Sequence, residues 1–304
     1  MTDSKLTLNL VVPDAMAAME FYEKAFGAVR GEVYHFPNRK GANETNVTVG
    51  GVNLRLMDEN ADYSCFPPKK GEVDSIWLQL EVDDAGEALK KAVACGASVG
   101  QAPSEFMGVR FAEITDPSGY VWTVNQILRE VSFEERYRFY EESHWEADKK
   151  KAADGDALPG ESELNDGKIV TGVELDMIVP DSLEALKLYE SIFDLQRIEV
   201  TDFPRGSNEV VFSIYSIHFH MLDENPDYKI IAPKPGDPKP IWYNITVPDI
   251  SETYAKALEA GCAEIQPITE FETHGVKNSM FSDPFGYIWM LKLSKNPVYG
   301  IIIS

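Results

Sequence analysis

Cysteine is scarce in this chain. Only Cys65, Cys95 and Cys262 occur among 304 residues, and they form neither a set of pairs nor a CxxC spacing. This usage fits a reducing compartment rather than a disulfide-built fold. Residues 1–4 show no basic stretch followed by an apolar core, so we expect no secretory signal and a cytoplasmic location.

Positive charge and long apolar runs are also scarce. The chain has 28 Lys and Arg against 50 Asp and Glu, a net charge of −22. An acidic surface repels phosphate backbones, so we expect no nucleic-acid partner. No apolar run approaches the roughly 20 residues that span a bilayer, so we expect no membrane partner. Phosphate-loop, Gly-x-Gly-x-x-Gly and Gly-x-Ser-x-Gly motifs are missing as well.

One pattern is present twice. Val12-Pro13-Asp14 recurs as Val179-Pro180-Asp181, and Ile76-Trp77 recurs as Ile241-Trp242. The turn sequence at 116–120 likewise returns at 283–287. A repeat of about 120 residues indicates a duplicated domain rather than a solenoid of short units. The duplication also serves as an internal comparison, because residue types kept in both copies are constrained by the fold or by a shared site.

Each copy divides into two βαβββ-like quarters. Leu6, Leu8 and Leu10 alternate as in a strand, Asp14 is placed to cap the following helix, and Gly27 ends that helix. The order repeats in the other three quarters, with cap residues Asp84, Asp181 and Asp249. The predicted fold class is α+β: four βαβββ modules in two domains, residues 1–128 and 169–304, that form a pseudo-two-fold chain.

The segment between the domains, residues 129–168, is predicted to hold an amphipathic helix and a flexible linker. Ser132 and Glu135 form a capping box. Aromatic side chains then fall on one helical face: Phe133, Tyr137, Tyr140 and His144. This stripe indicates packing against a domain, with a partner-binding helix as the alternative. Residues 153–167 are rich in Gly, Asp and Glu, as in a linker.

These residues resemble the vicinal-oxygen-chelate superfamily, which includes glyoxalase I, fosfomycin and bleomycin resistance proteins, and extradiol dioxygenases. The resemblance rests on a cap Asp, a helix ending in Phe-Tyr…Phe-Gly, and an Asp-Pro-x-Gly-Tyr-x-Trp turn, and it covers both copies. It is closest to the glyoxalase-like branch from phosphonate operons. The resemblance implies paired modules whose strands curl around a cleft, and metal enzymes of the group carry His, Glu or Gln ligands on the first and last strands of each module.

The ligand positions implied by the resemblance can be tested one by one. In the first copy they are Thr7, Arg55, Trp77 and Thr123, and in the second they are Glu174, His220, Trp242 and Met290. If modules pair across the copies, the sets become Thr7, Arg55, Trp242 and Met290, and Glu174, His220, Trp77 and Thr123. No set reaches three ligands, so we expect no complete metal site, with Glu174 and His220 as the metal candidates.

Glutamates stand where the closest branch often carries a His. One of these two, Glu44 or Glu209, would add a donor to a metal site. The alternative for Glu174 and Glu209 is a carboxylate paired with a nearby Lys or Arg, and for His220 a hydrogen-bonded histidine inside a cleft. The resemblance also places Trp77 and Trp242 in the clefts, where an aromatic ring either stacks on a flat ligand or plugs the half-barrel as core.

The resulting hypothesis is a cytosolic, glyoxalase-like protein that binds a small organic ligand without a complete metal site. Its expected ligand-binding residues are Trp77, Trp242, Thr7, Arg55, Thr123, Glu44, Glu209 and Met290. One alternative is a metal-dependent lyase, isomerase or dioxygenase with one asymmetric cleft, and another is a drug- or toxin-sequestering resistance protein. The covalent pair of domains predicts an intramolecular pseudo-dimer, and a further homodimer stays open.

Overall fold

The computed structural model describes residues 6–35, 43–60, 65–69, 76–139, 173–215, 217–228, 230–234, 241–271 and 276–294. In the first copy the elements are β1 (Leu6–Val12), α1 (Ala15–Phe26), β2 (Val29–His35), β3 (Asn43–Val49), β4 (Val52–Asp58), β5 (Ile76–Glu81), α2 (Ala85–Ala94), β6 (Ser98–Phe106), β7 (Val109–Thr115) and β8 (Val121–Ile127). In the second copy they are β9 (Val173–Val179), α4 (Ser182–Ile192), β10 (Leu195–Val200), β11 (Glu209–Ile214), β12 (Ile217–Asp223), η2 (Pro226–Tyr228), β13 (Ile241–Thr246), α5 (Ile250–Glu259), β14 (Ala263–Phe271), β15 (Val276–Ser282) and β16 (Ile288–Ser294). The predicted α+β fold of tandem βαβββ modules is confirmed.

The helices begin where the sequence predicts. Asp14, for example, accepts hydrogen bonds from the backbone N–H groups of Met16 and Ala17, which satisfies donors that have no partner inside the helix. A second aspartate supports the same helix end, because Asp58 Oδ1 accepts from the Ala15 N–H at 2.7 Å. In the second copy Asp223 Oδ1 accepts a hydrogen bond from the N–H of Ser182, the first residue of α4, at 2.7 Å. The recurring aspartates are therefore needed by the fold and are not by themselves evidence of a site.

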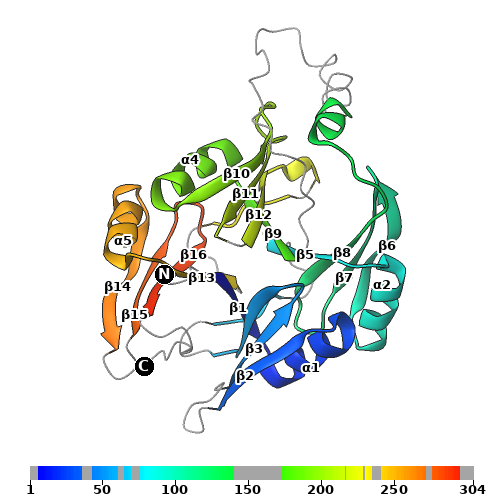
Figure 1. The fold of residues 1–304 in the computed structure, drawn as a ribbon, viewed down its shortest axis with the longest axis horizontal. Helices are drawn as coiled ribbons and strands as arrows, with labels where there is room; N and C mark the ends of the chain where they lie inside the picture. The colour runs from blue at the N-terminus through cyan, green and yellow to red at the C-terminus, as the bar shows by residue number, and fades with distance from the viewer. Residues whose placement is uncertain are drawn as a thin grey trace.

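The strands form two eight-stranded sheets, and each sheet combines modules from both copies (Figure 1). The first sheet has the order β14-β15-β16-β13-β1-β4-β3-β2, and the second has the order β10-β11-β12-β9-β5-β8-β7-β6. The joins are antiparallel pairs of β1 with β13 and of β5 with β9. Modules therefore pair across the copies, which decides between the two arrangements that the sequence left open.

The helices lie in two pairs between the sheets, α1 with α2 and α4 with α5 (Figure 1). Side chains of alternating strand residues point toward these helices and form one large apolar core, with Leu8, Trp122, Leu175 and Trp289 all fully buried. The remaining strand residues point away from the helices. We call this second surface of each sheet its inner face. Within the part of the chain described here, no helix is both long and apolar enough to cross a membrane.

The turn that recurs at 116–120 and 283–287 is explained by the core. Asp116 is buried, and its Oδ2 accepts hydrogen bonds from the hydroxyl of Tyr22 at 2.6 Å and from Nε1 of Trp122 at 3.1 Å. In the second copy Asp283 Oδ2 accepts from Tyr189 and Trp289, both at 2.8 Å. A buried carboxylate needs such donors, so these aromatic residues are kept for folding rather than for chemistry.

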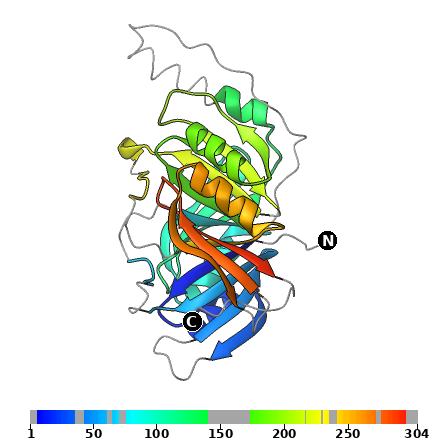
Figure 2. The ribbon, with the colours of Figure 1, turned by 90° about the vertical axis from the view of Figure 1, so that its left-hand side faces the viewer.

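A short helix at 133–139 follows the first copy and lies beside the second sheet (Figures 1 and 2). It contacts both edges of that sheet. The ring of Tyr137 stacks on Phe203, beyond β10, at 4.8 Å, and Phe139 meets Phe106 of β6 edge to face at 5.4 Å. This part of the predicted aromatic stripe packs against the domains, while Tyr140 and His144 lie outside the described residues.

Candidate functional site

Polar side chains gather at the centre of the second sheet's inner face. Glu174 and Asp176 lie on β9 and His220 lies on the neighbouring strand β12. They share this face because residues two apart on a strand point the same way, and because Asp176 and His220 are register partners. We call these three residues the acidic cluster. Their ligand atoms all lie within 4.8 Å of one another.

His220 makes the central contacts of the acidic cluster. Its Nδ1 lies 2.8 Å from Asp176 Oδ1 and 3.9 Å from Glu174 Oε1. Its Nε2 lies 3.5 Å from Oε2 of Glu209, on β11. Glu209, named in the sequence analysis as an additional donor, therefore adjoins the cluster on the far side of the imidazole.

Two amides hold the carboxylates in place. Gln79 Nε2, on β5, donates to Asp176 Oδ1 at 2.9 Å and to Glu174 Oε1 at 3.3 Å. Asn125 Nδ2, on β8, donates to Gln79 Oε1 at 2.5 Å. This chain of hydrogen bonds runs across four strands and orients the cluster in the way that outer-shell partners orient metal ligands.

The cluster concentrates charge in a buried place. Burial raises the pKa of Glu174 to about 7 and also raises the pKa of Asp176. Burial lowers the pKa of His220, but hydrogen bonds and charge from Asp176 and Glu209 outweigh it and raise that pKa well above its ordinary value. Asp176 is 0% exposed, and its Oδ2 has no hydrogen-bond partner among the described residues. A buried carboxylate oxygen without a donor is costly.

These features fit a divalent cation. Two carboxylates and one imidazole are the donor set that zinc and other first-row metals take in proteins. The cation would neutralise the crowded carboxylates and would give Asp176 Oδ2 a partner. Asp176 and Gln79 do not stand at positions implied by the resemblance, so neither was predicted as a site residue. Strand parity was the available signal, since each lies two residues beyond an inspected position.

The first sheet has different side chains at the equivalent positions. Thr7 stands in place of Glu174, Asn9 in place of Asp176, and Arg55 in place of His220. Arg55 is 5% exposed and forms an ion pair with Glu44. Lys292, on β16, takes the place of Asn125. Its pKa is lowered to about 8 by burial and by the charge of Arg55. This inner face therefore carries two cationic side chains, Arg55 and Lys292, together with Glu44, whereas the centre of the second sheet carries the carboxylates of Glu174 and Asp176.

The structure divides the predicted site residues between these two faces. Trp77, Thr123 and Glu209 join Glu174 and His220 on the second sheet, where Trp77 is the register partner of Asp176. The other five lie on the first sheet: Thr7, Arg55, Trp242, Met290 and Glu44. Trp242 packs against two small apolar groups there, one containing Met57 and Cys65 and the other Met280 and Met290.

The helix at 133–139 adds one charged residue near the acidic cluster. Arg136 forms an ion pair with Glu199 of β10, and both act electrostatically on Glu174. The helix also contacts both edges of the second sheet and lies beside that sheet (Figure 1). The ion pair of this helix with Glu199 could not be predicted, because the sequence of the helix does not indicate which strand Arg136 contacts.

Comparisons with solved structures show the same fold over nearly the whole chain. Glyoxalase I from Zea mays covers 95% of this chain and 92% of its own, with a TM-score of 0.63 and 12% sequence identity. A putative dioxygenase from Bacillus subtilis covers 95% of this chain and 84% of its own, with a TM-score of 0.53 and 10% identity. At these identities the likeness concerns the fold alone.

Sequence comparisons add the family. An uncharacterized protein of Mycobacterium bovis is 31% identical over 136 residues, which are 43% of this chain and 88% of that protein. The sequence profile of the Glyoxalase/Bleomycin resistance protein/Dioxygenase superfamily matches residues 6–124 and again residues 173–291. The two matches coincide with the two copies of the repeat. The chain thus belongs to the glyoxalase, bleomycin resistance protein and dioxygenase superfamily, the vicinal-oxygen-chelate group.

Proposed function

We propose that this chain is a divalent-metal enzyme that acts on a small organic substrate at the acidic cluster. This is the asymmetric, metal-dependent alternative of the sequence analysis, and one observation carries it. Three donors from adjacent strands converge within 4.8 Å, and one buried oxygen among them, Asp176 Oδ2, has no hydrogen-bond partner within the described ranges of the chain. The cluster supports a cation more directly than it supports a metal-free cleft, because crowded buried carboxylates are costly without compensating charge.

Glu174, Asp176 and His220 would hold the cation, which when bound would act as a Lewis acid toward oxygen atoms of the substrate. The surrounding residues have separate tasks. Gln79 fixes the two carboxylates through its amide N–H groups and is itself fixed by Asn125. Glu209 lies beside Nε2 of His220 and is placed to orient the imidazole or to take a proton from it.

Trp77 and Thr123 are proposed as substrate contacts. Trp77 is partly exposed on the same inner face and is the register partner of Asp176, so its ring adjoins the place where a substrate would meet the cation. An aromatic surface there favours an organic substrate with an apolar or planar part. The names of the two structural relatives, a glyoxalase I and a putative dioxygenase, are consistent with reactions of small oxygen-bearing molecules.

Metal binding tests the proposal before any substrate is known. Protein stripped with chelator and returned to buffer would be titrated with Mn²⁺ or Zn²⁺ while heat release and melting temperature are recorded. We expect one cation per chain and a raised melting temperature, since a ligand that binds only the folded state stabilises it. Asp176→Ala should abolish both effects. Asn9→Ala changes the equivalent buried position of the other sheet. This variant should still bind one cation and show the raised melting temperature. Equal behaviour of the two variants would reject the proposal.

A further inference from the structure

We propose that the inner face of the first sheet is a second, metal-free site that binds a small organic anion with an apolar body, such as an aromatic carboxylate. Its residues are Arg55, Lys292, Asn9, Trp242 and Met290, which we call the Arg55 site. The inference does not depend on the cation proposed for the second sheet. Four features of these residues support it: charge, a buried amide, a buried indole N–H and an apolar wall.

Two cationic side chains share this face. Arg55 comes from β4 and Lys292 from β16, and each alternates with core residues that point toward the helices. Burial and then the charge of Arg55 lower the pKa of Lys292, which agrees with their placement on one face of the same sheet. Arg55 also pairs with Glu44. A bound carboxylate would lie between the cations, and the planar guanidinium suits two parallel hydrogen bonds to it.

Two buried polar atoms on the same face have no hydrogen-bond partner among the residues that the structure describes. Asn9 is 1% exposed, and its Oδ1 accepts no hydrogen bond from them. Trp242 Nε1 is likewise buried without an acceptor in this part of the chain. Asn9 is the register partner of both Arg55 and Trp242, so these groups lie side by side across β4, β1 and β13. A ligand with an anionic oxygen would supply the acceptor that the indole N–H lacks and would offset the cost of leaving that N–H unpaired. Asn9 Oδ1 is itself an acceptor and would need a donor group instead.

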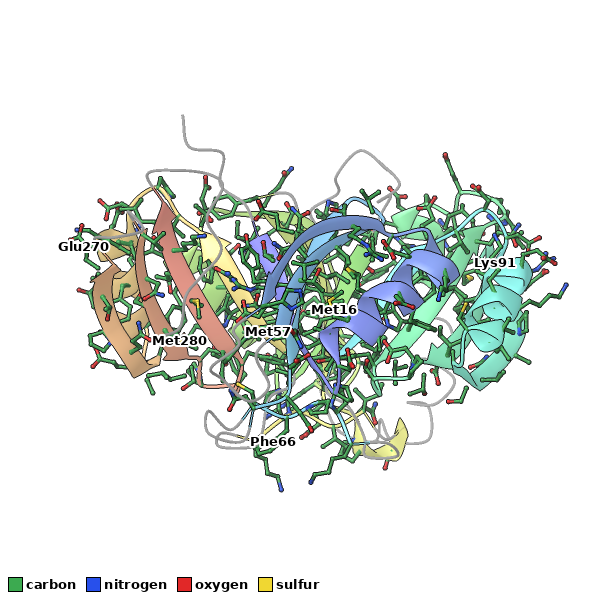
Figure 3. The ribbon with its side chains drawn as sticks, turned by 90° about the horizontal axis from the view of Figure 1, so that it is seen from below. Met16, Met57, Phe66, Lys91, Glu270 and Met280 are labelled. Atoms are coloured by element: carbon green, nitrogen blue, oxygen red, sulfur yellow. The ribbon has the colours of Figure 1, made fainter. Side chains whose placement is uncertain are left out.

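The apolar wall explains why an organic anion fits better than an inorganic one. Trp242 packs against one apolar group that contains Met57 and against another formed by Met280 and Met290. Met57 lies on β4 and Met280 on β15, and both are labelled in Figure 3. Thioether and indole surfaces pack well against an aromatic ring, and flexible methionines adapt to its shape. Charge and apolar surface are thus combined on one face.

The internal repeat shows that this chemistry is not required by the fold. The equivalent positions of the second sheet hold Asp176 for Asn9, His220 for Arg55 and Asn125 for Lys292. The same backbone positions therefore differ in charge between the two sheets. A carboxylate, Asp176, stands where the first sheet has the neutral Asn9, and the first sheet has the cationic Lys292 where the second has the neutral Asn125. Packing alone does not require such exchanges of charged for neutral side chains. We infer that the two inner faces have diverged to bind ligands of opposite charge.

Benzoate and its neutral isostere benzamide test the site in the presence of EDTA, which removes any contribution from a bound cation. Tryptophan fluorescence and calorimetry should show saturable binding of one benzoate per chain, with benzamide at least about tenfold weaker because it lacks the charge. Lys292→Met and Trp242→Phe should each weaken benzoate binding several-fold. Lys256→Met, an exposed lysine on α5, should leave it unchanged.

Arg55→Gln is the most direct variant, but it leaves Glu44 without its partner. Its fold would be checked by circular dichroism, and Lys292→Met keeps the test valid if Arg55→Gln does not fold. Equal affinity for benzoate and benzamide, no benzoate binding up to about 10 mM, or full binding in Lys292→Met and Trp242→Phe would each overturn the Arg55 site. Loss of benzoate binding in Asp176→Ala would show that benzoate binds at the second sheet instead of at the Arg55 site. Failure of the metal proposal alone would leave all these results unchanged.

Discussion

His220 and Asp176 are register partners on parallel strands, and His220 Nδ1 lies 2.8 Å from Asp176 Oδ1. Their counterparts in the other sheet, Arg55 and Asn9, are register partners in the same way. One pair brings a carboxylate to an imidazole and the other brings an amide to a guanidinium. Duplication has therefore placed different side chains at equivalent backbone positions of the two sheets.

Gln79→Leu tests whether the amide network supports the cation site. The amide of Gln79 contacts both carboxylates of the acidic cluster, and removal of such an outer-shell partner typically lowers metal affinity about 10–100-fold. Calorimetric titration with Mn²⁺ would measure the loss. Asn244→Leu changes the equivalent position on β13 and is expected to leave the affinity as it was. Equal losses in both variants would show a general effect on the fold instead.

Tyr189→Phe should destabilise the protein without affecting either site. The Tyr189 hydroxyl donates to the buried Asp283 at 2.8 Å, and loss of a hydrogen bond to a buried carboxylate costs about 1.5–3 kcal/mol of unfolding free energy. Urea unfolding would measure it. Tyr22→Phe, which removes the corresponding bond to Asp116 at 2.6 Å, should cost a similar amount. A loss below about 0.5 kcal/mol in both would show that the recurring turn does not depend on these hydroxyls.

Lys292 predicts a pH dependence of stability. Burial first, and then the charge of Arg55, lower its pKa from 10.5 to about 8 in the folded protein. Between these two pH values the folded state therefore binds fewer protons than the unfolded state. The free energy of unfolding consequently increases, and the protein becomes more stable, as pH rises from 8 to 10.5. Comparison with Lys292→Met isolates this contribution, because other groups titrate alike in both proteins.

The same titration affects ligand binding at the Arg55 site. A benzoate bound beside Lys292 favours the charged ammonium, so its affinity should fall as pH rises above 8 in the wild-type protein. The fall should be smaller in Lys292→Met. Stability curves of the two proteins that run parallel across this pH range would contradict the assigned environment of Lys292.

Much of the fold follows from local chemistry that is visible in the sequence. The aspartate caps, the glycine after α1 and the recurring Asp-Pro turn each have a backbone requirement that one residue type satisfies, so their positions could be predicted. Pairing of modules could not, because within-copy and cross-copy sheets use identical strand patterns. Only the contacts of β1 with β13 and β5 with β9 distinguish them.

The candidate site was predicted in part, for a related reason. Glu174 and His220 were identified from positions implied by the resemblance, but Asp176 was not inspected, although it lies on the same strand and points to the same face. Lys292 was missed in the same way. Interactions that reach from one strand to the next, such as Gln79 with Asp176, depend on the register between β5 and β9. That register joins a strand of the first copy to a strand of the second, so it cannot be predicted from the sequence of one copy.

The central claim is that one cation binds at the acidic cluster and none binds beside Arg55. Crystals of the wild-type protein grown with Mn²⁺, with diffraction data recorded to show the anomalous signal of manganese, test it most directly. The account predicts one strong peak within about 2.0–2.3 Å of donor atoms of Glu174, Asp176 and His220, and no peak on the inner face of the first sheet. The absence of a peak at the acidic cluster, or an equal peak beside Arg55, would contradict it.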